Sequence, residues 1–195
     1  MQAKTIYLSL ALGAWLLSGS TLLNPAVLFK SDDFQRTLLQ CDQGKVQIRS
    51  EAPLELIEAQ SNKLRGVIDT AGQSFAWSVE LKSFNGFNSP LQREHFNENY
   101  LESTRFPKAS FSGKIIEKID FQRDGVYNVR AKGKFAAHGV EQERIIKSRL
   151  TVKKGKVIVH STFTVLLADH DITIPRIVYQ KIAEEVTVTI DAELN

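Results

Sequence analysis

The residues in this chain that could bind a metal are its four histidines and the acidic residues beside them. The tightest group is Asp169-His170-Asp171, and a second candidate is His95 with Glu94 and Glu98. A zinc site needs its ligands close together on one element or on facing strands. The isoleucines and the proline that follow Asp171 favour a solvated turn, and charged helix faces are usually solvated. We therefore predict no metal site.

The chain also lacks the residue patterns of the common catalytic sites. It contains no Gly-x-Ser-x-Gly nucleophile motif, no phosphate-binding loop and no His-Glu-x-x-His zinc motif. Cys41 is the single cysteine, so it cannot form a disulfide within the chain, and no neighbouring residue would activate its thiol. We predict neither an enzyme nor a cofactor-binding protein, and the fold must depend on its hydrophobic core.

The charge balance argues against binding to nucleic acid. The chain has 25 Lys and Arg residues against 22 Asp and Glu residues, a net charge of +3, and no basic stripe with interleaved aromatic residues. Hydrophobic residues make up 43% of the chain, which is enough for a sizeable core.

The first residues have the pattern of a secretory signal. Lys4 precedes an apolar run over residues 6–17, and Ser18-Gly19-Ser20 then supplies small residues suited to cleavage. We predict a signal peptide over residues 1–20 and a location outside the cytoplasm. The alternative is an uncleaved membrane anchor, because residues 5–29 carry no charge and are long enough to cross a bilayer. We expect membrane contact only through such an anchor.

Cys41 does not fit a lipoprotein attachment site. The bulky Gln40 precedes it, and charged residues separate it from the apolar run. We predict that Cys41 is not lipidated, that residues 21–35 form a tether and that residues 36–195 form one domain.

Beyond residue 36 the apolar residues recur at every second position, which is typical of antiparallel strands with one buried and one wet face. The clearest runs are Phe75–Leu81, Tyr127–Phe135, Val157–Leu167 and Val186–Leu194. About eight strands are expected, and a sheet of that size loses its exposed edges by closing into a barrel. The interior of such a barrel is either filled by side chains or holds one small ligand. We predict an all-β, antiparallel barrel.

Two local turns are also expected in the first part of the domain. Residues 37–41 and 45–50 read as a hairpin whose turn is Asp42-Gln43-Gly44, and Asn62 reads as a further turn.

Two stretches depart from the period of two. Residues 90–102 predict a helix, because Ser89 can cap it, Pro90 suits its first position and apolar residues follow at helical spacing. Residues 175–183 predict a second, weaker helix.

Three segments resemble the YceI-like domain family. Residues 94–111, Glu-His-Phe-Asn-Glu-Asn-Tyr-Leu-Glu-Ser-Thr-Arg-Phe-Pro-Lys-Ala-Ser-Phe, are similar to that family's helix running into an aromatic-Pro-x-x-x-Phe strand start. Residues 133–140, Gly-Lys-Phe-Ala-Ala-His-Gly-Val, are similar to its Gly-x-Leu-x-x-x-Gly-x segment, with Phe135 in place of leucine. The final run over residues 185–194 also fits. Residues 83–93 are more apolar than the family's usual Thr-x-x-x-x-Arg-Asp-like loop.

This resemblance implies an eight-stranded, lipocalin-like antiparallel barrel in the bacterial envelope, with an internal pocket for a polyisoprenoid chain, such as a polyprenyl lipid or a quinone tail.

Candidate ligand-binding residues share an inward face of a strand or a place near the barrel mouth. The strand candidates are Phe75, Trp77, Val79, Phe111, Tyr127, Val129, Phe135, Phe163, Val165, Val188 and Ile190. The mouth candidates are Phe84, Phe87, Phe96, Tyr100 and Phe106. Two alternatives stay open: the strand residues fill a solid core, and the helix plugs one end of the barrel.

The function expected from these features is binding or carriage of an isoprenoid or similar lipid outside the cytoplasm, in the periplasm or envelope. The alternative is an envelope protein with a packed barrel that acts through its outer surface, and an enzyme at the barrel mouth ranks third. The sequence leaves the oligomeric state open.

Overall fold

The computed structural model describes residues 38–195. The predicted signal peptide and tether, residues 1–20 and 21–35, lie outside the described residues. Within the described part, no helix is both long enough and apolar enough to cross a membrane.

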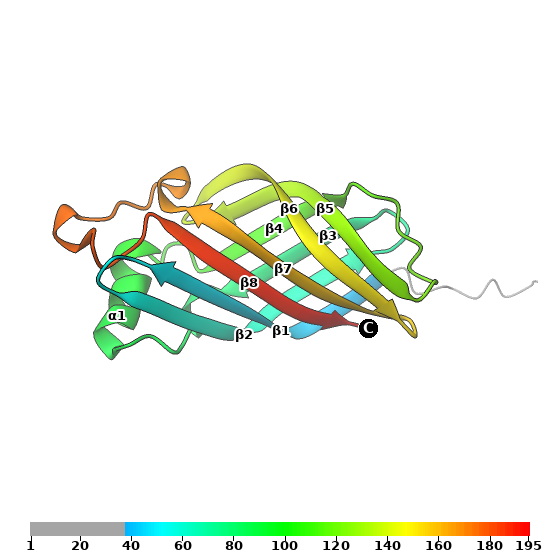
Figure 1. The fold of residues 1–195 in the computed structure, drawn as a ribbon, viewed down its shortest axis with the longest axis horizontal. Helices are drawn as coiled ribbons and strands as arrows, with labels where there is room; N and C mark the ends of the chain where they lie inside the picture. The colour runs from blue at the N-terminus through cyan, green and yellow to red at the C-terminus, as the bar shows by residue number, and fades with distance from the viewer. Residues whose placement is uncertain (1–37) are drawn as a thin grey trace, which may run out of the picture. The chain divides into compact units, whose positions relative to one another are not determined.

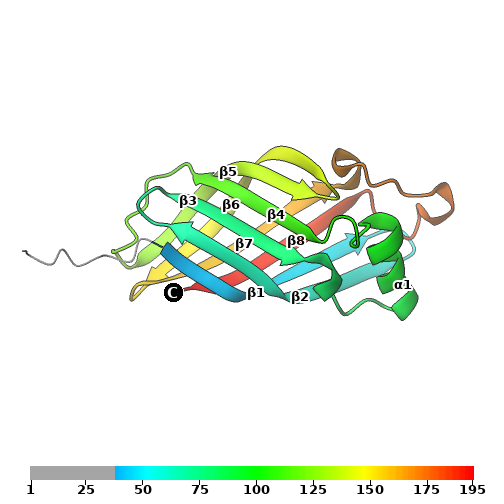
Figure 2. The ribbon, with the colours of Figure 1, turned by 180° about the vertical axis from the view of Figure 1, so that it is seen from behind.

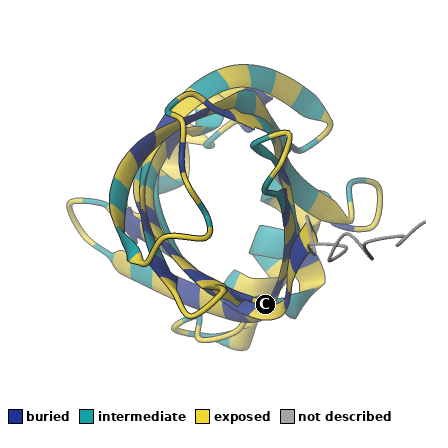
Figure 3. Ribbon diagram, turned by 90° about the vertical axis from the view of Figure 1, so that its right-hand side faces the viewer, coloured by how far each residue is buried: buried dark blue, intermediate teal, exposed yellow. Residues whose placement is uncertain are grey.

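Eight antiparallel strands form a closed barrel in which every strand pairs with its neighbours in sequence and the last pairs with the first (Figure 1). The strands are β1 Leu38–Glu51, β2 Leu56–Asp69, β3 Ser74–Glu80, β4 Lys108–Ile115, β5 Gly125–Ala137, β6 Val140–Lys153, β7 Lys156–Leu166 and β8 Glu185–Leu194. The predicted eight-stranded antiparallel barrel is confirmed. Buried and exposed residues alternate along the strands, as the period of two requires (Figure 3).

The longer connections lie at one end of the barrel. Helix α1, Pro90–His95, continues into a π-helical turn, η2, Phe96–Tyr100, between β3 and β4. The Ser89 hydroxyl accepts a hydrogen bond from the Gln92 amide at 3.2 Å, so the predicted cap is present. Short 3₁₀ turns occur at η1 Leu81–Ser83, η3 Leu167–His170 and η4 Arg176–Val178. The second predicted helix, residues 175–183, is wrong in extent, because only η4 is helical.

The predicted hairpin at residues 37–50 is wrong. Residues 38–51 form the single strand β1, and its register to β2 shifts between Cys41 and Gly44 and again between Gly44 and Val46. These shifts are bulges, which add residues to a strand without reversing it. The bulge turns Cys41 and Val46, an odd and an even position, to the same inner face.

The predicted turn at Asn62 is also wrong. Asn62 lies inside β2, between Ser61, which pairs with Val46, and Leu64, which pairs with Gly44. The irregular pairing with β1 absorbs the local break in the apolar pattern, so the chain does not reverse there.

The end of the barrel that holds the C-terminus is closed by the loop between β4 and β5. Ile119 of this loop is buried in the core, and its carbonyl accepts a hydrogen bond from Gln73 Nε2 at 3.2 Å. Glu117 accepts hydrogen bonds from the Arg130 amide at 2.6 Å and from Arg130 Nε at 2.7 Å. These two contacts hold the pKa of Glu117 below its usual value. α1 lies at the opposite end (Figure 2).

A candidate ligand-binding cavity

A cavity of about 450 Å³ occupies the half of the barrel that is nearest to α1 and to the segment between β7 and β8. Its wall combines strand residues with residues of η1, α1, η2 and η3. The volume falls within the range of small-molecule sites, roughly 300–1,000 Å³. The other half of the barrel is packed with buried side chains, among them Leu39, Ile68, Ile146, Leu150, Val152, Val157 and Leu194. The hollow and the packed barrel, posed above as alternatives, therefore occur in the two halves of one molecule.

Most of the predicted ligand-binding residues line this cavity. They are Trp77, Val79, Phe84, Phe87, Phe96, Tyr100, Phe111, Phe135, Phe163, Val165, Val188 and Ile190. The mouth aromatics also pack on one another, since the Phe96 ring centroid lies 5.7 Å from that of Phe84 and 5.0 Å from that of Phe87. The helix thus covers one end of the barrel and contributes to the cavity wall as well.

Four predicted residues do not line the cavity. Phe75 and Val129 are buried in the packed half. The Tyr127 hydroxyl donates to the Arg123 carbonyl at 3.0 Å, next to the loop that closes the barrel. Phe106 lies outside the cavity, where its ring packs edge-on against His138 at 5.0 Å. Alternation correctly placed the three strand residues on the inner face, but it does not report depth along the barrel.

Trp77 lies at the boundary between the two halves. It lines the cavity and pairs with Gly66 on β2, whereas Phe75, two residues away on β3, is buried outside the cavity. A Cβ atom on Gly66 would lie 2.0 Å from Trp77 Cε3, so the ring covers the glycine. Because Gly66 has no side chain, the indole of Trp77 can lie in this position.

Several cavity residues were not predicted. Leu81, Leu167 and Val186 belong to the alternating apolar runs of the sequence, and the same alternation could have found them. Ile48 on β1 and Ile57 on β2 also line the cavity. Others come from the connections around the mouth: Leu101, Ile172, Val178 and Ile182. No strand period applies to the loop residues of this group, so only the folded structure brings them to the cavity.

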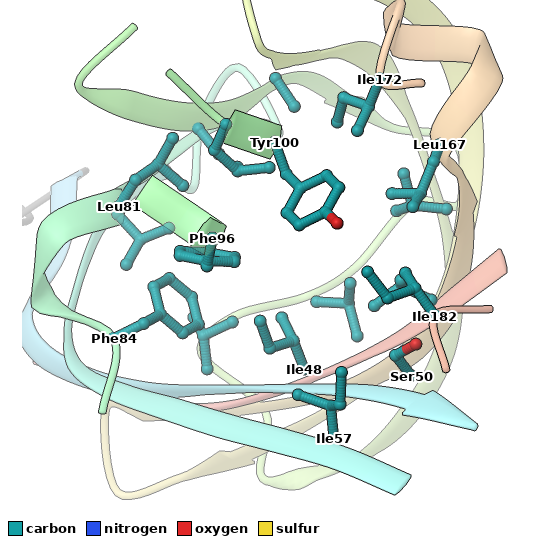
Figure 4. A pocket seen from close by; sticks show the side chains of 18 of the residues that line it. Ile48, Ser50, Ile57, Leu81, Phe84, Phe96, Tyr100, Leu167, Ile172 and Ile182 are labelled. Carbon is teal, nitrogen blue, oxygen red and sulfur yellow. The ribbon is translucent and has the colours of Figure 1, made fainter. Parts of the chain in front are cut away.

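The polar groups of the cavity are few. Tyr100 projects into it between Phe96 and Leu167 (Figure 4), and burial raises the pKa of its phenol. His95 and Lys181 also line the cavity. None of these three side chains makes a hydrogen bond or ion pair with another residue of the described 38–195 region. All three can donate hydrogen bonds.

Three further polar residues of the cavity wall, Ser50, Glu55 and Gln92, are hydrogen-bonded within the protein. Glu55 accepts a hydrogen bond from Gln92 Nε2, which joins the β1–β2 connection to α1. Ser50 Oγ accepts from the Ala183 amide at 2.9 Å, which joins β1 to the segment before β8. These contacts hold the connections around the mouth together.

Two of the histidines, His138 and His170, make contacts within the folded structure. His170 is fully buried, so the solvated turn predicted around it is wrong at this residue. Its Nδ1 lies 3.1 Å from the Val140 carbonyl, and the His170 carbonyl lies 2.9 Å from His138 Nδ1. The Phe135 ring packs edge-on against the imidazole of His170 at 5.1 Å. Among residues 38–195, no group of three or more His, Cys, Asp or Glu side chains is placed to hold a metal ion.

Cys41 is buried in β1, where its sulfur lies 4.0 Å from the Leu64 carbonyl. Burial raises the pKa of its thiol, which disfavours the reactive thiolate. The geometry gives Cys41 a role in packing.

The family model of the YceI-like domain matches residues 41–194. No curated protein matches the chain in sequence. Among solved structures, a polyisoprenoid binding domain from Saccharophagus degradans implicated in plant cell wall breakdown is 14% identical, with a TM-score of 0.65 over 82% of this chain and 98% of the other.

Two further solved structures share the fold. BcnA from Burkholderia cenocepacia is 15% identical, with a TM-score of 0.63 over 77% of this chain and 95% of the other. The YCEI protein of Campylobacter jejuni is 15% identical, with a TM-score of 0.54 over 69% of this chain and 82% of the other.

Proposed function

This chain belongs to the YceI-like domain family, and from that premise we propose that its barrel binds a long apolar amphiphile, a polyisoprenoid or quinone-type lipid, outside the cytoplasm. The observation that carries the proposal is the apolar cavity in one half of the barrel. The name of the Saccharophagus degradans domain, a polyisoprenoid binding domain of the same fold, supports the ligand class.

The cavity volume sets the length of chain that fits. A volume of 450 Å³ corresponds to roughly 15 groups of the size of water or methylene. That is about three isoprene units, so a longer chain would extend through the mouth. At ~0.8 kcal/mol for each buried methylene, 15 groups contribute roughly 12 kcal/mol before the cost of association. Chain burial alone is enough for binding, and it discriminates poorly between chain types.

The polar groups of the cavity favour a head group with acceptor oxygens. Tyr100, His95 and Lys181 each have a donor without a partner among the described residues. A carbonyl or phosphate oxygen near them would accept these hydrogen bonds. The role proposed is binding and carriage without catalysis. The alternative of a solidly packed barrel that acts through its surface is less well supported, because only one half is packed.

The proposal is tested by the lipids that accompany the protein. We expect mass spectrometry of organic extracts of the purified chain to show a co-purifying isoprenoid. We also expect a fluorescent polyprenyl probe to bind saturably, with one site on each chain. No extracted lipid together with no saturable probe binding would contradict the proposal and favour the packed barrel.

Export is a separate part of the proposal, and it rests on the sequence over residues 1–20. We expect N-terminal sequencing of the mature protein to start near Thr21. A full-length product in the membrane would favour the uncleaved anchor. A full-length product in the cytoplasm would contradict export.

A further inference from the structure

We propose that the mouth of the barrel docks on the surface of a lipid bilayer, where the protein takes up or delivers its ligand. This inference rests on the proposed function and extends it, because it assigns a second surface, outside the cavity, that contacts lipid.

Exposed apolar side chains gather around the mouth. They are Leu54 (67% exposed), Leu56 (43%), Leu91 (57%), Ile177 (91%) and Tyr179 (61%), and we call them the apolar rim. Single exposed apolar residues are normal on soluble proteins, but a group of them beside a pocket marks an interaction site.

Hydrogen bonds hold the segments of the rim together as one surface. The Leu54 amide donates to the Gln180 carbonyl at 2.9 Å, which joins the β1–β2 connection to the segment after η4. Asn88 Nδ2 donates to the Leu56 carbonyl at 2.9 Å, which joins the loop before α1 to β2. Three segments far apart in the sequence therefore present their apolar side chains at the same end of the barrel.

The rim is continuous with the cavity wall. In the η4 segment, Val178 and Ile182 line the cavity, whereas Ile177 and Tyr179 are exposed. Along α1 and η2, Phe96 lines the cavity and Leu91 is exposed. An apolar path thus leads from the cavity to the outer surface. A long hydrocarbon leaves water only for another apolar phase, so the phase that meets this path is the interior of a bilayer.

The charges around the rim are of both signs. Residues 171–185 contain Arg176 and Lys181 but also Asp171, Glu184 and Glu185. Glu55, which is bonded to Gln92, and Glu94 and Glu98 on the helix segment add further acidic groups nearby. The rim therefore contacts a bilayer through its apolar side chains, without the cluster of basic residues that selects anionic lipids.

The test places an environment-sensitive fluorophore at single positions of the full chain. Ile177→Cys and, as a matched control, Val126→Cys are labelled in a Cys41→Ser background. Val126 is also exposed (62%), but it lies at the closed end, where its neighbour Gly125 pairs with Val152 near the β6–β7 turn. Any contribution of residues 1–37 is the same in both variants.

On phosphatidylcholine vesicles, the label at position 177 is expected to shift to the blue and to be quenched by brominated acyl chains. The label at position 126 should do neither. Equal responses at both positions, no response at position 177, or a shift that depends on protein concentration without vesicles would overturn the inference. The last result would indicate self-association.

A transfer assay separates docking from ligand binding. Leu54→Asp combined with Ile177→Asp should slow the movement of a polyprenyl probe from vesicles by about tenfold or more, because two apolar contacts with the bilayer are lost. Its affinity for the probe dispersed in detergent should stay unchanged, and Val126→Asp should alter neither quantity. Unchanged transfer in the double variant would overturn docking while the proposed function stands. No binding of dispersed probe by the wild type would instead overturn the proposed function.

Discussion

Replacing Ala109 with Trp is expected to abolish saturable binding of a polyprenyl probe while the barrel stays folded. Ala109 lies on β4, lines the cavity and pairs with Val79 of the adjacent strand β3. An indole there occupies space that the ligand chain would fill. Loss of about four buried methylene positions weakens binding by roughly 3 kcal/mol, more than 100-fold. The free energy of unfolding should fall by less than about 1 kcal/mol, because the cavity accepts the added volume.

The matched control is Ala131→Trp on the neighbouring strand β5. Ala131 is buried in the packed half, where it pairs with Ile115 and Ile146. With no space for an indole, the substitution should cost about 3 kcal/mol or more, at or beyond the upper end for overpacked cores. Urea denaturation of the ligand-free proteins measures both values. Equal destabilisation by the two substitutions would show that Ala109 faces no cavity, and wild-type probe affinity in Ala109→Trp would place the ligand elsewhere.

Replacing Gly133 with Ala is expected to destabilise the barrel by about 3 kcal/mol or more, a large effect for one methyl group. Gly133 of β5 pairs directly with Gly113 of β4. A Cβ atom at Gly133 would lie 2.1 Å from the Ser112 carbonyl oxygen, and one at Gly113 would lie 2.1 Å from that of Lys132. These atoms belong to the backbone of paired strands, so the clash is relieved only by separating β4 from β5.

Gly125→Ala provides the control on the same strand. The nearest atoms to a Cβ there belong to the Tyr127 side chain at 3.4 Å, which is ordinary van der Waals contact. We expect a change within about 1 kcal/mol, measured by thermal and urea unfolding. If Gly133→Ala unfolds at the same denaturant concentration as Gly125→Ala, the close approach of β4 and β5 does not occur in solution.

On strands with a regular register, the alternation of apolar and polar residues was sufficient to predict the strand and its inward face. The runs that begin at Phe75, Tyr127, Val157 and Val186 all turn their apolar residues inward. The prediction failed in β1 because the inward face changes from odd to even positions across the bulge at Gly44. A switch of the apolar residues from odd to even positions beside a glycine is compatible with a turn as well as with a bulge. Only the pairing of this segment with β2 and β8 distinguishes the two.

The helix over residues 90–100 was predicted because its signals are local. Ser89 and Pro90 act within one turn of the helix. The segment over residues 175–183 has the apolar spacing of a helix but folds mainly as a loop. Its conformation depends on hydrogen bonds to distant parts of the chain, such as the Leu54 amide and Ser50 Oγ.

On the strands with a regular register, the sequence by itself determined which residues face the interior of this barrel, because the side-chain period of a strand is a local property of its backbone. The tertiary structure alone decided how deep each residue lies, since depth follows from strand register, which pairs residues far apart in the chain. Phe75 and Trp77 share a face and differ only in this respect: Phe75 belongs to the packed half, and Trp77 lines the cavity. Hollow space itself arises where the connections at the mouth cover the barrel without filling it, and no local pattern encodes that volume.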